Sequence, residues 1–129
     1  MLRTGILNPH LNALLSRIRH TNLLVIADRG FPYWPMIETV DISLIDGIPT
    51  VLQVLTAIRS NFVIGRAWMA NEFTENNDAN TRTRFATSLE GLPVEFLPHT
   101  AFKERVPSAI GLVRTGDTTQ YSNLILESA

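Results

Sequence analysis

The chain has 129 residues, no cysteine and a net charge of −1 from 11 Lys and Arg against 12 Asp and Glu. A chain of this length forms one ordinary domain without a disulfide or metal staple, and the lack of cysteine excludes a disulfide framework and a thiolate nucleophile. The balanced charge argues against nucleic acid and anionic lipid as partners. The longest apolar runs, such as Leu23–Ala27, are far shorter than a membrane span, and no secretory signal is visible, so we expect a cytoplasmic protein.

The first third of the chain reads as a helix, a buried strand and a loop. Asn8 and Pro9 are typical of an N-cap and a first helical residue, and apolar residues follow at helical spacing. The continuous apolar segment Leu23–Ala27 predicts a strand that is buried on both faces. Gly and Pro punctuate residues 28–32, which we expect to form a loop.

Helices and strands continue to alternate in the rest of the chain. Thr50 can cap a helix, the polar run at 75–78 leads into a helix that continues to about Leu89, and a short helix is expected over residues 100–106. Strands are predicted over residues 38–42, 62–69, 94–97, 109–113 and 121–126. The pattern indicates a single α/β domain over residues 1–129, with helices flanking a mixed sheet because the last two strands are close enough to form a hairpin.

Two of the three histidines are candidate functional residues, and Asp28 and His99 lie where ligand-binding groups collect in α/β proteins. His20 is expected at the end of the first helix, and Asp28 at the carboxyl end of the following strand. His99 follows the strand at 94–97 and precedes a short helix that carries Lys103. Imidazole gives and takes protons near neutral pH, which suits acid–base chemistry. The alternatives are a histidine that interacts with the helix dipole, a turn-forming aspartate and a solvated loop at His99.

The C-terminal segment offers hydrogen-bonding groups of both senses. Arg114 and the Tyr121-Ser122-Asn123 run can hold sugar hydroxyls, and a tyrosine ring can lie against the apolar face of a sugar. The alternative is a hairpin with an interior tyrosine. The aromatic residues of the 31–34 loop can border a pocket or simply pack. No phosphate-binding glycine loop and no paired histidines at metal-ligand spacing occur, so the sequence gives little support to nucleotide or metal chemistry.

Several blocks together resemble the D-ribose pyranase and L-fucose mutarotase family. The first and last blocks are the most specific, whereas residues 33–92 agree in spacing more than in identity. Trp34, Trp68 and the Asn-rich run at 76–80 are not family features. The blocks are Gly5-Ile6-Leu7-Asn8, His20-Thr21, Val25-Ile26-Ala27-Asp28 with Gly30 and Pro32, Leu97, His99, Phe102-Lys103, Arg114-Thr115-Gly116 and Tyr121-x-Asn123-x-Ile125-Leu126.

The resemblance implies an α/β subunit in a ring-shaped homo-oligomer, a decamer or octamer, whose active sites are shared between neighbours and need no cofactor. Its catalytic acid would be His20. The other implied site residues would bind a free monosaccharide, with Lys103 and Arg114 in supporting roles and His99 favouring the ribose-type branch. They are Asp28, His99, Tyr121, Asn123, Lys103 and Arg114.

The implied reaction interconverts pyranose and furanose rings, or α and β anomers, of a sugar. It requires protonation of the ring oxygen while the anomeric hydroxyl loses its proton, and therefore needs neither metal nor covalent nucleophile. An enzyme of this kind is the leading hypothesis. The rivals are a non-catalytic monosaccharide-binding protein accessory to sugar uptake and a purely structural ring-forming protein.

Overall fold

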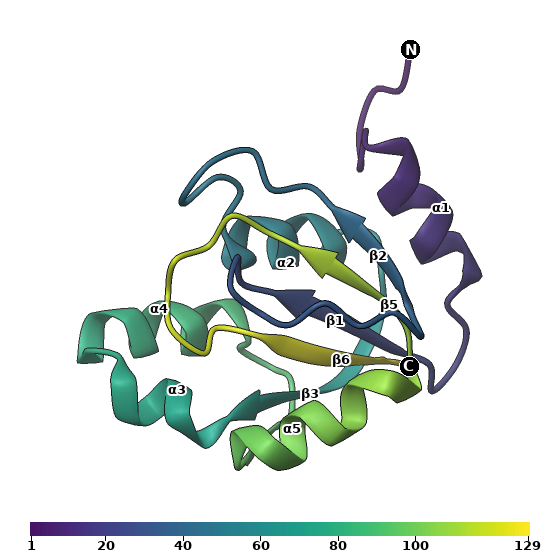
Figure 1. The fold of residues 1–129 in the computed structure, drawn as a ribbon. Coiled ribbons are helices and arrows are strands. Elements are labelled where there is room, and N and C mark those ends of the chain that lie inside the picture. Colours follow the sequence, from purple (N-terminus) through teal and green to yellow (C-terminus); the bar gives the residue numbers. More distant parts are fainter.

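The computed structural model describes residues 1–129 as one sheet with helices on both faces (Figure 1). The helices are α1 (Pro9–Arg17), α2 (Val51–Arg59), α3 (Asn71–Asn76), α4 (Ala79–Ser88) and α5 (His99–Arg105), with a 3-10 turn, η1, at Val106–Ser108. The strands are β1 (Leu23–Ala27), β2 (Glu38–Asp41), β3 (Ile64–Ala70), β4 (Val94–Leu97), β5 (Ala109–Arg114) and β6 (Leu124–Ser128). The predicted α/β architecture with flanking helices is thus confirmed.

The predicted helix starts are made by side-chain caps. Asn8 Oδ1 accepts the Leu11 N–H at 3.0 Å, and Pro9 takes the first helical position of α1. Thr50 Oγ1 accepts the Gln53 N–H at 3.1 Å, while Gln53 Oε1 accepts the Thr50 N–H in return. Such reciprocal caps satisfy backbone donors that have no partner inside the helix.

The six strands lie in the order β2-β5-β1-β6-β3-β4. β6 runs antiparallel to both of its neighbours, β1 and β3, whereas the other adjacent pairs are parallel. The sheet is therefore mixed, as predicted, but the hairpin between the last two strands is wrong. β1 separates β5 from β6, because the long connection over residues 115–123 carries the chain past β1 instead of turning it back on β5.

Two local features differ from the prediction. The helix expected after the polar run at 75–78 is α4, which Asp78 Oδ1 caps by accepting the Thr81 N–H at 2.8 Å, but α3, which ends at Asn76 within that run, was not predicted. The last strand begins at Leu124, three residues later than expected, and Tyr121 lies in the preceding loop with φ of 54°. Polar loop residues thus continue up to the edge of the sheet.

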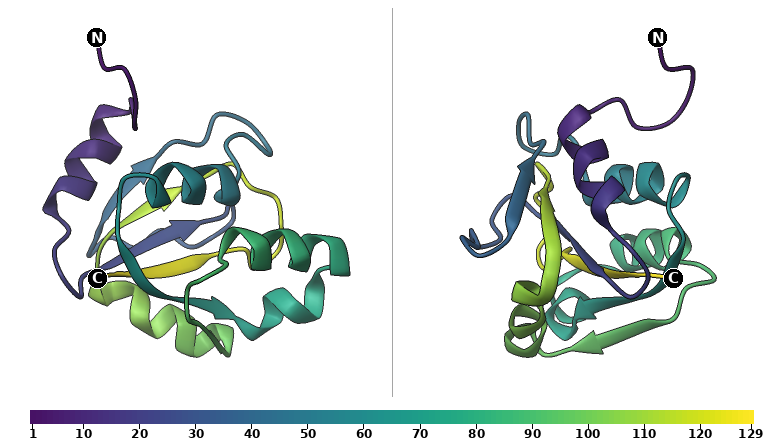
Figure 2. Two further views of the ribbon diagram at one scale, coloured as in Figure 1. Left: turned by 180° about the vertical axis from the view of Figure 1, so that it is seen from behind. Right: turned by 90° about the vertical axis from the view of Figure 1, so that its right-hand side faces the viewer.

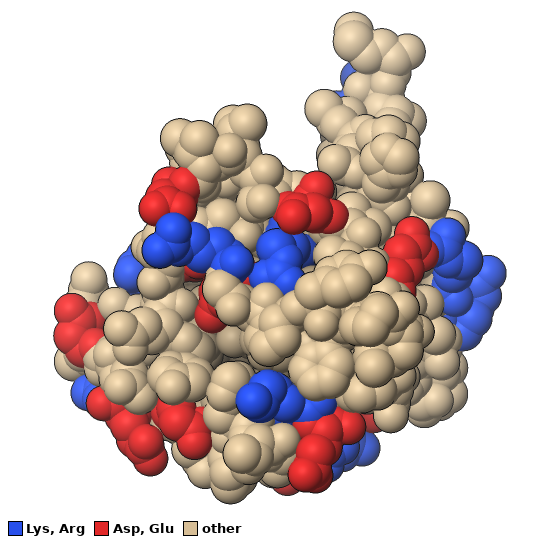
Figure 3. Space-filling view, viewed as in Figure 1, with Lys and Arg blue, Asp and Glu red and all other residues tan.

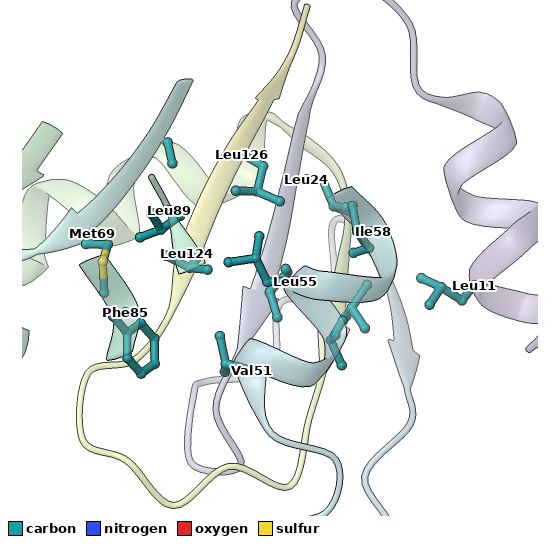
Figure 4. Close-up of a cluster of buried hydrophobic side chains, with 14 of the residues drawn as sticks. Leu11, Leu24, Val51, Leu55, Ile58, Met69, Phe85, Leu89, Leu124 and Leu126 are labelled. Atoms are coloured by element: carbon teal, nitrogen blue, oxygen red, sulfur yellow. The ribbon is translucent and has the colours of Figure 1, made fainter. Parts of the chain in front are cut away.

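Each face of the sheet has its own hydrophobic core. Residues of α1, α2 and α4 pack on one face (Figure 4), and α5 packs on the other, an arrangement that the two views of Figure 2 also show. β6 serves both cores, since Leu124 and Leu126 face the first and Ile125 the second, all three fully buried. This alternation fixes the register of β6, because a slip by one residue would invert its faces.

The surface carries charges of both signs. Figure 3 shows Lys and Arg interspersed with Asp and Glu over the face drawn, without a broad patch of one sign. None of the helices combines the length and apolar character that crossing a membrane requires.

Candidate functional site

The polar groups singled out from the sequence meet at one edge of the sheet. Asp28 follows β1 and His99 follows β4, so both lie at carboxyl ends of parallel strands, where ligand sites of α/β folds form. Because β6 is antiparallel, the residues that precede it reach this same edge. Tyr121 and Asn123 thereby join Asp28 and His99, although the four residues are far apart in the sequence.

These four residues line a cavity of about 320 Å³. That volume is at the small end of the range for ligand pockets and suits a small molecule. The sequence did not single out Gln120, which also faces the cavity, because no motif distinguishes an exposed glutamine in a loop. The complete lining is Asp28, Gly30, Phe31, Pro32, His99, Gln120, Tyr121 and Asn123.

Asn123 holds Asp28 from two sides. Its side-chain oxygen accepts the backbone N–H of Asp28 at 2.7 Å, and its Nδ2 donates to Asp28 Oδ2 at 3.2 Å. The other carboxylate oxygen, Oδ1, accepts the Gly30 N–H at 2.9 Å. Asn123 is only 2% exposed, so this pair fixes the carboxylate in the cavity wall. Each oxygen keeps a free lone pair for a ligand hydroxyl.

The environment of Asp28 disfavours its charge. Burial raises the pKa of Asp28 above its usual value of 3.8, and the nearby Asp117 adds to the rise. The hydrogen bonds from Gly30 and Asn123, together with one from Phe31, oppose the rise by stabilising the carboxylate. A desolvated acceptor of this kind binds a hydroxyl donor more strongly than one surrounded by water.

His99 presents an imidazole among aromatic rings. Its ring centre lies 5.0 Å from that of Tyr121 in an edge-to-face arrangement, and 6.1 Å from those of Phe31 and Phe102. His99 Nε2 is buried and has no hydrogen-bond partner. An unpaired buried nitrogen is costly, so its persistence at a cavity is typical of a site that a ligand completes.

Burial is the first cause of a lowered His99 pKa, and the charge of Lys103 lowers it further. Glu72 and Asp28 act in the opposite direction. At neutral pH the ring is therefore uncharged, with one nitrogen as donor and the other as acceptor. A neutral imidazole can accept or donate one hydrogen bond to a polar ligand.

Tyr121 has an uncommon backbone conformation. Its φ of 54° lies in the left-handed region, which costs a non-glycine residue about 1 kcal/mol or more. Asn123, two residues on, is tied to Asp28 as described, and the Tyr121 ring packs against His99. These contacts hold Tyr121 in a strained conformation beside the cavity.

Arg114 and Lys103, the two supporting residues, are not in the cavity lining. The Arg114 guanidinium donates to the backbone carbonyls of Asp28, Arg29 and Pro32 at 3.1 to 3.3 Å. It therefore braces the loop that forms one wall of the cavity. Lys103 lies one helical turn after His99 on α5, where its charge acts on the His99 ring.

His20 is the one predicted site residue that lies far from the cavity of its own chain. α1 ends at Arg17, three residues earlier than His20, which is exposed at the amino end of β1. A strand rises about 3.3 Å per residue, so the two ends of β1 lie roughly 15 Å apart. Within one chain, His20 cannot reach a molecule bound at Asp28.

The aromatic loop both packs and borders the cavity. Phe31 is 5% exposed, lines the cavity and meets Phe102 edge to face at 6.1 Å. Trp34 packs behind Phe31 at 6.3 Å, whereas Tyr33 is 70% exposed. Both interpretations of this loop therefore apply, each to different residues.

The molecule has further cavities, and one of them, of about 240 Å³, is also polar, with Asn8, His10, Glu38, Thr39, Val40 and Asp41 in its lining. No group of three or more His, Cys, Asp or Glu side chains is placed to hold a metal ion. A second cavity, of about 390 Å³, lies between α3, α4 and the edge strand β4 and is lined mainly by apolar side chains such as Phe73, Phe85 and Phe96. The cavity at Asp28 and His99 differs from these in combining a desolvated carboxylate with a buried imidazole nitrogen that has no hydrogen-bond partner.

Comparison with known proteins matches the whole chain to one family. The model of the RbsD / FucU transport protein family matches residues 1–129. A D-ribose pyranase of Geobacillus kaustophilus is 38% identical over 128 residues, which cover 99% of this chain and 93% of that protein. A D-ribose pyranase of Laribacter hongkongensis is 36% identical over 129 residues, covering 99% and 97% of the two chains.

Solved structures share the fold. Bacillus subtilis RbsD, determined in complex with D-ribose, has a TM-score of 0.91 at 29% identity and covers 100% of this chain and 98% of its own. The fucose mutarotase of Streptococcus pneumoniae, determined with L-fucose, has a TM-score of 0.83 at 20% identity, with 99% and 98% covered. With a family model that spans the whole chain, and relatives above 30% identity that cover nearly all of it, this protein belongs to the RbsD / FucU family.

Proposed function

We propose that this protein is a sugar ring-form isomerase of the D-ribose pyranase type, which interconverts the pyranose and furanose forms or the anomers of a free monosaccharide. The observation that carries the proposal is the cavity in which Asp28, His99, Tyr121 and Asn123 converge. Full-length relatives named D-ribose pyranase, at up to 38% identity, support the same activity. A cytoplasmic location, the compartment predicted from the sequence, is part of this proposal.

The cavity offers what an uncharged sugar needs. The Asp28 carboxylate accepts from hydroxyl groups, while the neutral His99 imidazole and the Tyr121 hydroxyl act in either sense. The rings of Phe31 and Tyr121 give the apolar faces of the sugar something to pack against. D-ribose, present in the complex of Bacillus subtilis RbsD, is the sugar that we expect to fit best.

Ring opening also needs a group that transfers protons, and we propose that His20 of a neighbouring subunit supplies it. The exposed position of His20, away from the cavity of its own chain, suits a residue that acts on another copy. In this proposal the subunits assemble into a ring, a decamer or octamer, with each sugar site at an interface. Imidazole can both give and take protons, so this histidine can protonate the ring oxygen as the ring opens and take up the proton that the anomeric hydroxyl releases.

A second candidate is a monosaccharide-binding protein that does not turn its ligand over. It is favoured by the observation that the cavity of one chain holds sugar-binding groups but only one histidine, the uncharged His99. Both candidates need Asp28, Tyr121 and Asn123, and only the enzyme needs His20.

Sugar binding and ring exchange, measured separately, distinguish the two candidates. Calorimetry with D-ribose, L-fucose and D-galactose reports binding, and NMR saturation transfer between the anomeric protons of the same sugars reports exchange. Binding with accelerated exchange supports the isomerase. Binding without accelerated exchange of any sugar supports the binding protein and contradicts the enzyme.

Mixed oligomers test whether the site is shared. His20→Ala and Asp28→Ala subunits, each expected to be inactive alone, would form some intact sites when they are unfolded together and reassembled, because a site that takes Asp28 from a His20→Ala subunit and His20 from an Asp28→Ala subunit carries neither defect. Partial recovery of exchange supports a shared site. A mixture that stays inactive, although wild-type protein treated in the same way regains activity, contradicts it. His10→Ala is the matched control, since His10 is exposed on α1 and is expected to leave exchange unchanged.

A further inference from the structure

We propose that Glu72 is a positioning residue for His99, and that α3 supports two separate segments of the cavity lining through its two ends. This inference rests on the proposed function, because it assigns His99 to ligand binding. Its first observation is a hydrogen bond between elements that are 27 residues apart: Glu72 Oε2 accepts the backbone N–H of His99 at 2.8 Å.

The sheet explains why these two residues meet. β3 and β4 are parallel neighbours, and their last residues, Ala70 and Leu97, are register partners. α3 begins directly after β3, and α5 begins at His99, two residues after β4 ends. Glu72 and His99 therefore hold matching positions, each two residues beyond the end of its strand.

α5 lacks a cap of its own. The residue before it is Pro98, which has no side-chain hydrogen-bonding group, and no side-chain cap bond is made there. The N–H of His99, the first residue of α5, would have no partner inside the helix. Glu72 supplies that partner from another element and so fixes the backbone from which the His99 ring projects into the cavity.

The other end of α3 reaches a second segment of the cavity lining. Asn77 Nδ2 donates to the backbone carbonyl of Gln120 at 2.8 Å and to that of Phe73, also at 2.8 Å. Gln120 lines the cavity next to Tyr121. Phe73, only 2% exposed, anchors α3 in the core. Asn77 thus gives a role to the Asn-rich run at 76–80, for which the family resemblance offered no explanation.

Glu72 also carries a charge toward His99. The charged groups that act on the His99 ring are Glu72 and Asp28, which favour its protonated form, and Lys103, which disfavours it. Removal of the Glu72 charge alone should lower the pKa of His99 further. Removal of the hydrogen bond as well should let the start of α5 shift. A positioning role therefore predicts two separable effects.

Two variants separate these effects. Glu72→Gln keeps a side-chain oxygen for the His99 N–H but removes the charge, while Glu72→Ala removes both. Glu75→Gln is the matched control, because it removes the same charge from an exposed position on α3 for which no hydrogen bond or ion pair is found. The readouts are the His99 pKa from an NMR titration of its ring protons, the sugar affinity, and the kcat and KM of ring exchange, all on the full-length protein.

We expect Glu72→Gln to lower the pKa of His99 while retaining most of the sugar affinity. Glu72→Ala should reduce ring exchange by up to about 100-fold, the loss that displacement of a site group by about 1 Å can cause. Its KM should also change more than that of Glu72→Gln. The inference is overturned if the His99 pKa and the sugar affinity of both variants equal those of Glu75→Gln. The titration of His99 requires no turnover. If the protein isomerised no sugar, the proposed function would be refuted, but the effect of Glu72 on the His99 pKa could still be measured.

Discussion

Replacing Asn123 by alanine removes both hydrogen bonds that join the start of β6 to the end of β1. The bond to the Asp28 N–H is short, at 2.7 Å, and its loss leaves a partly buried donor without a partner. The bond to the Asp28 carboxylate is longer, at 3.2 Å, so it contributes at the lower end of the range for charged groups. Together these losses lower the free energy of unfolding by about 2–4 kcal/mol.

Urea unfolding measures this loss. With a slope of about 2 kcal/mol per molar urea, the midpoint of the variant should fall by about 1–2 M. Asn61→Ala is the control. Asn61 makes one exposed side-chain bond, to the Ala57 carbonyl, and its loss should cost no more than about 0.5 kcal/mol.

The loss of stability in Asn123→Ala should also depend on pH, in a direction that follows from the pKa of Asp28. The pKa of Asp28 is already raised in the folded protein, and loss of the Asn123 bond raises it further. A carboxyl group whose pKa is higher in the folded than in the unfolded protein contributes its full stability below the unfolded pKa, here 3.8. That contribution is lost as the pH rises through the folded pKa. The difference between wild type and Asn123→Ala is therefore smallest below pH 3.8 and largest at neutral pH. A loss under about 1 kcal/mol, with an unchanged Asp28 titration, would refute the two-sided hold on Asp28.

Three further predictions concern the other groups around the cavity. Arg114→Met releases the three carbonyls of the 28–32 loop, so hydrogen exchange in this loop and the sugar dissociation constant should rise together; weaker binding with an unchanged loop would instead make Arg114 a direct sugar ligand. Tyr121→Phe keeps the ring packed against His99 and removes one hydroxyl, so calorimetry should show about five- to tenfold weaker sugar binding with unchanged unfolding; equal affinity would remove the hydroxyl from the site. Sugar affinity should be constant from pH 8 to 6.5 and fall at lower pH as the ring of His99, whose pKa is lowered by burial, becomes protonated; affinity that stays constant down to pH 4.5 would show that neutral His99 is not needed. The same lowered pKa means that unfolded chains bind more protons just below pH 6.5, so the free energy of unfolding also falls there as the pH drops.

Local signals in the sequence were sufficient for the starts of α1 and α2 and for the buried strand β1, but not for α3, which has no side-chain cap. Asn8 and Thr50 act through side chains within three residues, and a continuous apolar run such as Leu23–Ala27 needs no information from elsewhere in the chain. The order of the strands was harder to predict. β5 and β6 are neighbours along the chain, yet β1 lies between them in the sheet. β1 pairs in parallel with β5 on one side and antiparallel with β6 on the other, and both pairings join segments that are far apart in the sequence.

The candidate site shows the same division. Asp28 and His99 were recognisable because each directly follows a strand, and Tyr121 and Asn123 because of their residue types. The roles of Arg114 and Glu72 were not recognisable, since both depend on backbone groups that are distant in sequence. The places of His20 and Asp28 at opposite ends of β1 could be predicted, whereas the meeting of His99, Tyr121 and Asn123 at the Asp28 end required the structure.

The central claim is that this protein catalyses the ring opening of a free sugar with the help of His20. NMR saturation transfer between the anomeric protons of D-ribose tests it most directly, with equal concentrations of wild type, His20→Ala and the His10→Ala control. We predict faster exchange with wild type and His10→Ala than in buffer, and exchange at the buffer rate with a folded His20→Ala protein. Wild-type exchange at the buffer rate for D-ribose, L-fucose and D-galactose would contradict the claim, and full activity of His20→Ala would remove His20 from the mechanism.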